Sequence, residues 1–176
     1  MRRLLLVLVP VLISQVAAAG GLPAADRLAI NEAIASYGHR FDRGDAEGLA
    51  ALFEPDGRWE AFINKAEKPV ISLLGREKIA AFAADRIRMF QAVGIETKHF
   101  MLDIVVTEQT PTQVSCSAMA IIFWQRPLHG DPLPRPVQTG YYDYVLRKGP
   151  EGWRFRSVAV RTSGYYRPEE VYPSIE

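Results

Sequence analysis

The chain has 176 residues, of which 48% are hydrophobic and 23% are charged, so intrinsic disorder is excluded as its main state. Its 21 basic and 20 acidic residues leave a net charge of +1, which favours neither nucleic acid nor an anionic membrane as a partner. The single cysteine, Cys116, cannot form an internal disulfide and lies in an apolar, strand-like segment, where it is expected to be a buried small hydrophobe.

Residues 1–19 have the pattern of a secretory signal peptide: two arginines, an apolar run from Leu4 to Ile13, and three alanines ending at Ala19. The run is shorter than the ~20 residues that a membrane span requires, so an uncleaved anchor is the less favoured alternative. We expect cleavage after Ala19 and a periplasmic or secreted protein. The mature chain then has 19 basic residues, because two of the 21 are lost, against 20 acidic ones.

Three helices are predicted in the N-terminal half, because apolar residues recur there at intervals of three and four. The first helix starts near Asp26, a candidate N-cap, and ends at Gly44. Asp45 is expected to cap a short second helix. The third helix runs between Gly75 and Gly94. The segment EPDG, after the second helix, is expected to form a turn.

Strand patterns occupy most of the remaining chain. RWEAFI and KPVISLLG are two extended segments, and four longer strand candidates follow Gly94 with turn signals between them. The proline-rich segment from Arg126 to Pro136 is expected to form a rim loop over a site or a dimer contact. Helices followed by strands predict an α+β fold, a cone-shaped barrel of three N-terminal helices packed on a curved, mainly antiparallel sheet.

His99 and Asp103 raise the main functional question, because they lie four apart in an apolar strand and therefore share one face of it. The other face, which includes Phe100 and Leu102, is wholly apolar and is expected to be buried as well. A buried ionisable group needs a partner, and Asp103, Asp42 or a backbone carbonyl could serve for His99. The residues alone favour a hydrogen-bonded core histidine over a catalytic one.

The order and spacing of five segments resemble the SnoaL-like members of the nuclear transport factor 2 superfamily: IASYGHRFDRGDAEGLAALFEPDGRW, LLGREKIAAF, KHFMLDIVV, GYYDYVLRK and GWRFRSVAV. The resemblance runs from Leu28 to Tyr165 and implies a SnoaL-like domain over residues 24–166, followed by a C-terminal tail at 167–176. It also implies a cone with a deep pocket and frequent dimers, but no particular activity, because one fold carries many functions.

Some superfamily members are lyases, including scytalone dehydratase, a lindane dehydrochlorinase and a bile-acid dehydratase. Similarity to their aspartate at the end of the first helix and their histidine on the first long strand implies roles for Asp42 and His99. Helical spacing alone places Asp42 on the flank of the apolar stripe and favours a solvated residue at the helix end. The bile-acid enzyme also resembles this chain at Tyr37 and, less closely, at Arg161. The segment SAMAIIFWQ lacks the strand acid of that enzyme, which argues against the same reaction on the same substrate.

The ketosteroid isomerases, another branch, have paired pocket groups that resemble Tyr37 and Asp143. Their catalytic aspartate would fall near Ala61, and the adjacent Glu60 points to the opposite face of a strand. Isomerisation through that base is therefore disfavoured. Asp143 could instead be a cross-strand ion partner.

The resemblance therefore implies a cofactor-independent lyase or isomerase that acts on a small, hydrophobic, oxygenated molecule. His99 would be the base, Asp42 its orienting partner and Tyr37 an acid or hydrogen-bond donor. Further candidates for substrate contact are Arg161, Asp103, Asp143, Trp59 and Phe123. Cysteine and histidine have no zinc-ligand spacing and no nucleotide motif is present, so we expect no metal and no cofactor. The alternative is a non-catalytic domain that binds a small molecule or assembles; either form is expected to be a homodimer.

Overall fold

The computed structural model describes residues 21–164 and 166–172, and the predicted leader lies outside them. The elements of this part of the chain are α1 (Ala24–Asp42), α2 (Ala46–Ala51), β1 (Phe53–Ile63), β2 (Ile71–Leu74), α3 (Arg76–Ala92), β3 (Glu96–Gln109), β4 (Gln113–Arg126), the short 3-10 helix η1 (Pro127–His129), β5 (Asp131–Gly149), β6 (Gly152–Thr162) and α4 (Pro168–Val171). None of these helices is long and apolar enough to cross a bilayer.

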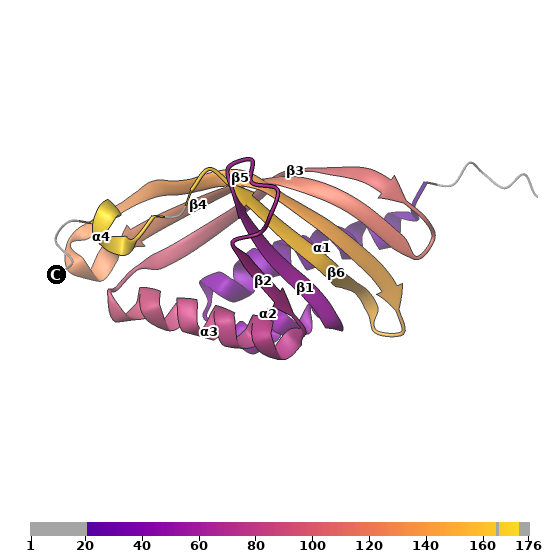
Figure 1. Cartoon of the computed structure of the whole chain (residues 1–176), viewed down its shortest axis with the longest axis horizontal. Helices are drawn as coiled ribbons and strands as arrows, with labels where there is room; N and C mark the ends of the chain where they lie inside the picture. The colour runs from indigo at the N-terminus through magenta and orange to yellow at the C-terminus, as the bar shows by residue number, and fades with distance from the viewer. Residues whose placement is uncertain (1–20, 165, 173–176) are drawn as a thin grey trace, which may run out of the picture.

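The six strands form one curved sheet in the order β2-β1-β6-β5-β4-β3. Every neighbouring pair is antiparallel except β1 and β6, which are parallel. Figure 1 shows the sheet arched over α1, α2 and α3, which cover its concave face. The short helix α4 lies near the end of β4 and the start of β5 (Figure 1). The predicted α+β plan is confirmed, with a sheet that stays open and a fourth short helix.

Two local predictions about the N-terminal helices have opposite outcomes. Asp45 caps α2 as expected, because its carboxylate accepts a hydrogen bond of 2.8 Å from the backbone N–H of Gly48. Asp26 is not the N-cap of α1, since that position is held by Pro23. The predicted turn EPDG is also wrong: it belongs to β1, where a register shift against β6 accommodates it.

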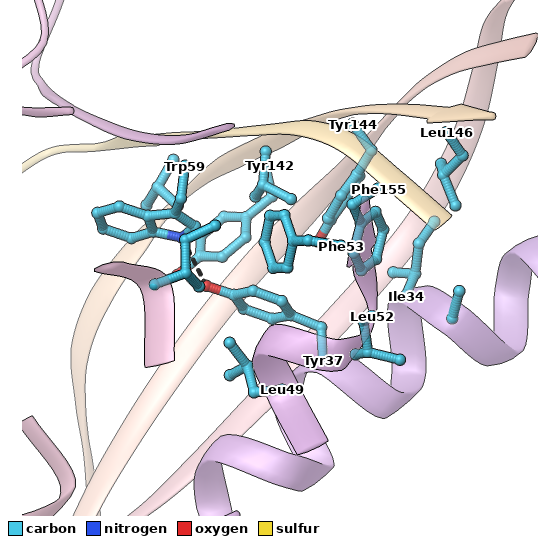
Figure 2. Close-up of a cluster of buried hydrophobic side chains, with 14 of the residues drawn as sticks. Ile34, Tyr37, Leu49, Leu52, Phe53, Trp59, Tyr142, Tyr144, Leu146 and Phe155 are labelled. Carbon is cyan, nitrogen blue, oxygen red and sulfur yellow. Dashed lines mark hydrogen bonds between the residues drawn. The ribbon is translucent and has the colours of Figure 1, made fainter. Parts of the chain in front are cut away.

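The main core lies between the concave face of the sheet and the three N-terminal helices. Alternate residues of β4 and β5 point into it, as expected for strands with one covered face. Figure 2 shows the aromatic centre of this core, where Tyr37 of α1 meets Trp59, Phe53, Tyr142 and Phe155 from the strands. Cys116 is buried in the same cluster, as predicted.

A smaller second cluster lies at the end of the sheet that carries η1. Its buried members are Ile95, Ile122, Trp124, Val137 and Tyr172. Tyr172 follows α4 and is 2% exposed, so the C-terminal tail packs against the sheet at this residue. The proline-rich segment is largely strand rather than loop, because β5 begins at Asp131 directly after η1.

Strand β3 departs from regular alternation at Asp103, which has a φ of 50° and lies in a register shift against β4. Such a bulge turns the following side chains to the opposite face. Three apolar side chains of β3 are partly buried against the core: Met101, Ile104 and Val106. Phe100, Leu102 and Val105 are 49%, 40% and 59% exposed. The expectation that both faces of β3 are buried is therefore wrong, because helices cover only the concave side of this edge strand.

Candidate active site

A cavity of about 100 Å³ lies between α1, α3 and the concave face of the sheet. Aromatic rings from several elements form much of its wall: Phe41, Trp59, Phe82, Phe90, Trp124 and Tyr142. Polar side chains from α1 and β3 also reach it, namely Tyr37, Thr97 and His99. A mainly apolar hollow with a few polar groups is the usual form of a small-molecule site.

His99 and Asp42 are hydrogen-bonded at the edge of this cavity. The Nδ1 atom of His99 lies 2.6 Å from Oδ1 of Asp42, and the two side chains are only 10% and 13% exposed. An ionised carboxylate can only accept, so Nδ1 carries the hydrogen and donates it. In the neutral form of the ring, Nε2 of His99 is then the nitrogen without a hydrogen, on a side chain that lines the cavity.

Asp42 accepts two further hydrogen bonds, both from β3. The hydroxyl of Thr97 donates to Oδ1 and the backbone N–H of His99 donates to Oδ2, each at 2.8 Å. Burial acts to raise the pKa of Asp42, but the hydrogen bonds and the charge interaction with His99, together with the Thr97 bond, outweigh it and lower that pKa below its usual value. The carboxylate is therefore ionised at neutral pH.

Gly38 explains how the last turn of α1 comes close enough to β3 for these contacts. It is buried, and a Cβ at this position would lie 2.9 Å from Cβ of His99. Asp42 follows four residues later on the same face of the helix. Gly38 is not among the residues predicted for the site, although an isolated glycine inside a helical pattern is a signal of close packing. Helical spacing alone favours a solvated Asp42 on the flank of the apolar stripe, whereas the structure buries this side chain against β3.

Tyr37 and Trp59 both line the cavity and contact each other. The indole N–H of Trp59 donates a hydrogen bond of 2.8 Å to the hydroxyl oxygen of Tyr37, as the dashed line in Figure 2 shows. The ring of Tyr37 packs edge-on against Tyr142 and Phe155, at centroid distances of 6.0 and 6.2 Å. This packing holds the phenol in one orientation at the cavity wall.

Arg161 and Asp143 do not line the cavity. They lie on the outer face of the sheet, where Nε of Arg161 is 3.1 Å from Oδ2 of Asp143 and each side chain is 44% exposed. The guanidinium of Arg161 also lies 4.2 Å from the ring centroid of Phe62, another outward residue. Their predicted place in the pocket is wrong, because inward and outward side chains alternate along β5 and β6. The cross-strand ion pair, left open for Asp143, is present.

Asp103 and Phe123 are also outside the cavity. Asp103 is exposed at the bulge of β3, so it shares no face with His99. Phe123 lies on the outer face of β4, where its ring packs against Phe100 at 5.5 Å. Its neighbours Ile122 and Trp124 line the cavity instead. In both cases a shift of one residue along the strand reversed the direction of the side chain.

Several polar residues that were not predicted from the sequence also line the cavity, among them Thr97 of β3, Arg86 of α3, Gln138 of β5 and Tyr166. Arg86 is half-buried on α3. This helix was predicted from its apolar residues alone, so the pattern offered no reason to select a charged residue on it. Among residues 21–164 and 166–172, no group of three histidine, cysteine or acidic side chains is arranged to hold a metal ion.

An open, curved sheet above three helices, with an apolar cavity between the layers, defines the cone-shaped α+β class of nuclear transport factor 2-like proteins. The SnoaL-like domain family matches residues 23–159. The chain therefore belongs to the SnoaL-like domain family. No match to a protein of curated function was found.

Solved structures with this fold are numerous. An NTF2-like protein with a cystatin-like fold from Novosphingobium aromaticivorans is 26% identical, with a TM-score of 0.64 over 84% of this chain and 88% of that one. ActVI-ORFA from Streptomyces coelicolor is 18% identical, with a TM-score of 0.69 over 82% and 100%. A candidate scytalone dehydratase from N. aromaticivorans is 19% identical, with a TM-score of 0.61 over 81% and 90%. The last two similarities establish the fold alone.

Proposed function

We propose that the protein is a cofactor-independent lyase or isomerase in which His99 removes a proton from a small, largely apolar, oxygenated molecule. The observation that carries this proposal is the 2.6 Å hydrogen bond between His99 and Asp42 at the wall of an apolar cavity. A carboxylate that orients a histidine and stabilises its protonated form is a common arrangement for general base catalysis.

Nε2 of His99 would accept a proton from a carbon next to an activating carbonyl or ring. The electron pair of the broken C–H bond then forms a new double bond. In an elimination, hydroxide leaves from the neighbouring carbon and takes up the proton as water; in an isomerisation, the proton returns to another carbon. Neither course changes the oxidation state of the whole molecule. The ionised carboxylate of Asp42 would stabilise the imidazolium that forms between the two steps.

Tyr37 would donate a hydrogen bond to the leaving oxygen or to the enolate. The hydrogen bond that its oxygen receives from Trp59 strengthens the phenol as a donor, because linked hydrogen bonds polarise one another. Trp59 would also contact the substrate through its ring. The fold similarity to a candidate scytalone dehydratase agrees with a dehydration, but says nothing about the substrate of this chain.

Proton abstraction can be tested without knowing the natural substrate. A panel of small β-hydroxy carbonyl compounds and phenols would be incubated with the protein in D₂O and followed by NMR for deuterium uptake and for products. We expect His99→Ala to abolish both while circular dichroism stays unchanged. His39→Ala is the matched control, because His39 is exposed on α1. Full activity of the His99 variant would rule out the mechanism.

The second candidate is a non-catalytic binding domain that uses the same cavity. One observation favours it: β4 contributes only Ile122 and Trp124 to the cavity wall, so this strand supplies no acid there. Saturable binding of panel compounds without deuterium uptake or product at any pH would favour this candidate over the lyase.

We also propose export to the periplasm or the cell exterior, which is supported by the leader pattern of residues 1–19. A homodimer is proposed as well, and exposed apolar side chains on the outer face of the sheet support it, among them Leu102 and Met119.

A further inference from the structure

We infer that Arg86 binds an ionised oxygen of the ligand, so that the cavity accepts a small planar ring that carries a carboxylate or a phenolate. This inference rests on the proposed function in treating the cavity as the ligand site, and it specifies the class of ligand. Arg86 would take the place that the sequence assigned to Arg161.

Arg86 is a cavity-lining cation without an acidic partner in residues 21–164 and 166–172. Its Nη1 atom lies 3.5 Å from the sulfur of Met89, and its guanidinium lies 5.7 Å from the ring centroid of Phe82. A thioether is a weak acceptor, so most of the five N–H donors remain available. Arg88, two residues further along α3, is instead exposed and pairs with Asp85 at 3.3 Å.

The charge balance of the cavity favours an anion. No aspartate or glutamate of the described chain lines it, and Asp42 is engaged by Thr97 and His99 at its edge. Arg86 brings a permanent positive charge to the cavity wall, because a guanidinium stays protonated in proteins. A half-buried guanidinium in an apolar hollow gains most from an acceptor that carries negative charge, because a carboxylate or phenolate oxygen makes short, charge-assisted bonds.

The size and walls of the cavity favour a single ring. Its volume of about 100 Å³ is below the ~150 Å³ of an engineered apolar cavity that binds benzene, so even one substituted ring requires the wall side chains to move apart, and a bicyclic ligand requires a larger movement. Aromatic pairs lie on several sides: Phe90 with Trp124 and Trp59 with Phe82, each at 5.1 Å, and Phe41 with His99 at 5.0 Å. Ring faces and edges of this kind pack well against a planar molecule.

Probe binding separates this inference from the reaction itself. Benzoate, benzamide and benzyl alcohol would be titrated calorimetrically into the full-length protein at pH 7.5. We expect benzoate to bind at least about tenfold more tightly than the two neutral rings, because one charge-assisted hydrogen bond increases the affinity by about this factor. Arg86→Met keeps much of the aliphatic volume and should remove this preference, while Arg88→Met, the matched control, should retain it.

A coloured probe then distinguishes the two kinds of anion. 4-Nitrophenol changes its absorption spectrum when it ionises, so the spectrum of the bound dye reports whether the cavity holds the phenolate. Enrichment of the bound phenolate in the unaltered protein and in Arg88→Met, but not in Arg86→Met, assigns phenolate binding to Arg86. A benzoate preference without phenolate enrichment restricts the inference to carboxylates.

His99→Ala separates the two proposals. A benzoate preference that persists in this variant supports the role of Arg86 whether or not turnover depends on His99. Equal preference in the unaltered protein and in Arg86→Met, or no preference in either, overturns the inference and leaves the proposed reaction untouched. Turnover that survives in His99→Ala while Arg86 governs benzoate binding overturns the reaction and leaves the inference standing.

Discussion

Gly38 of α1 and His99 of β3 are in direct contact, since a Cβ on Gly38 would lie 2.9 Å from Cβ of His99 and 3.3 Å from its carbonyl oxygen. The contact brings the C-terminal turn of α1 against β3, and Asp42, one helical turn later, reaches the imidazole. The geometry of the candidate site therefore depends on a residue that carries no side chain.

Gly38→Ala tests this dependence. Alanine is preferred over glycine in a helix by about 1 kcal/mol, but the added methyl group meets Cβ and the backbone of His99. Because a strand backbone cannot move cheaply, we expect a net loss of about 1–3 kcal/mol in unfolding free energy and reduced turnover. Urea denaturation measures the first effect. Asn31→Ala, at an exposed position of the same helix, should be neutral or slightly stabilising; an equally stabilising Gly38→Ala would contradict the packing argument.

Asp42→Asn should separate the orienting role of the carboxylate from its shape. The amide oxygen can still accept a hydrogen bond from the backbone N–H of His99, but the amide nitrogen donates toward Nδ1. The ring hydrogen then moves to Nε2, so the base is lost, and turnover should fall by about 10²–10⁴-fold. Nitrogen NMR of the imidazole reports the tautomer. Asp45→Asn is the control, because asparagine is an equally good N-cap, and unchanged turnover in Asp42→Asn would refute the orienting role.

Thr97→Val tests the lowered pKa of Asp42. The folded-state pKa lies below that of the unfolded chain, so this carboxylate stabilises the fold above about pH 4, and the effect is lost as pH falls through the folded-state pKa. Removing the Thr97 hydroxyl should raise the pKa of Asp42 and cost about 1 kcal/mol at neutral pH. Denaturant titrations at pH 7 and pH 3 should show this difference shrinking in acid. A difference of the same size at both values would mean that the charge is not involved.

Cys116 should be unreactive in the native protein. It is buried in the core, and burial together with the charge of Asp143 raises the pKa of its thiol to about 12. Since the thiolate is the reactive form, iodoacetamide at pH 8 should label Cys116 only as fast as the protein unfolds. Mass spectrometry in buffer and in guanidinium chloride compares the two states. Rapid stoichiometric labelling in buffer would show that the core is open at this point.

A charged substitution on the outer face of the sheet tests the homodimer. Met119 and Tyr141 are 36% and 55% exposed, beside Leu102 at 40%, and such a cluster of apolar side chains favours association. We expect light scattering after size exclusion to give a dimer mass for the unaltered protein and a monomer mass for Met119→Glu. Val70→Glu, at a position 54% exposed in the segment before β2, should remain dimeric. A monomeric unaltered protein at micromolar concentration would refute the prediction.

The sequence predicted local elements well, because helix and strand periods repeat over a few residues. The spacing of apolar residues gave the three N-terminal helices and the strands of the arched sheet, and Asp45 was recognised as a cap from its neighbours alone. Asp42 and His99 were selected through the resemblance to a family, whereas helical spacing alone pointed Asp42 toward solvent. Asp26 was misplaced as a cap because its partners, Lys148 and Trp153, lie more than a hundred residues away in the chain.

What the sequence by itself determined was the three N-terminal helices, the main strands, their order and the class of fold. Only the tertiary structure decided which side chains face the cavity. Asp103, Arg161 and Phe123 were assigned to the wrong side, while Arg86 was overlooked on a helix. The physical reason is that a strand reverses the direction of its side chains at every residue, so one bulge or a shift of one position exchanges cavity for solvent. That register depends on contacts between distant segments, which local patterns do not contain.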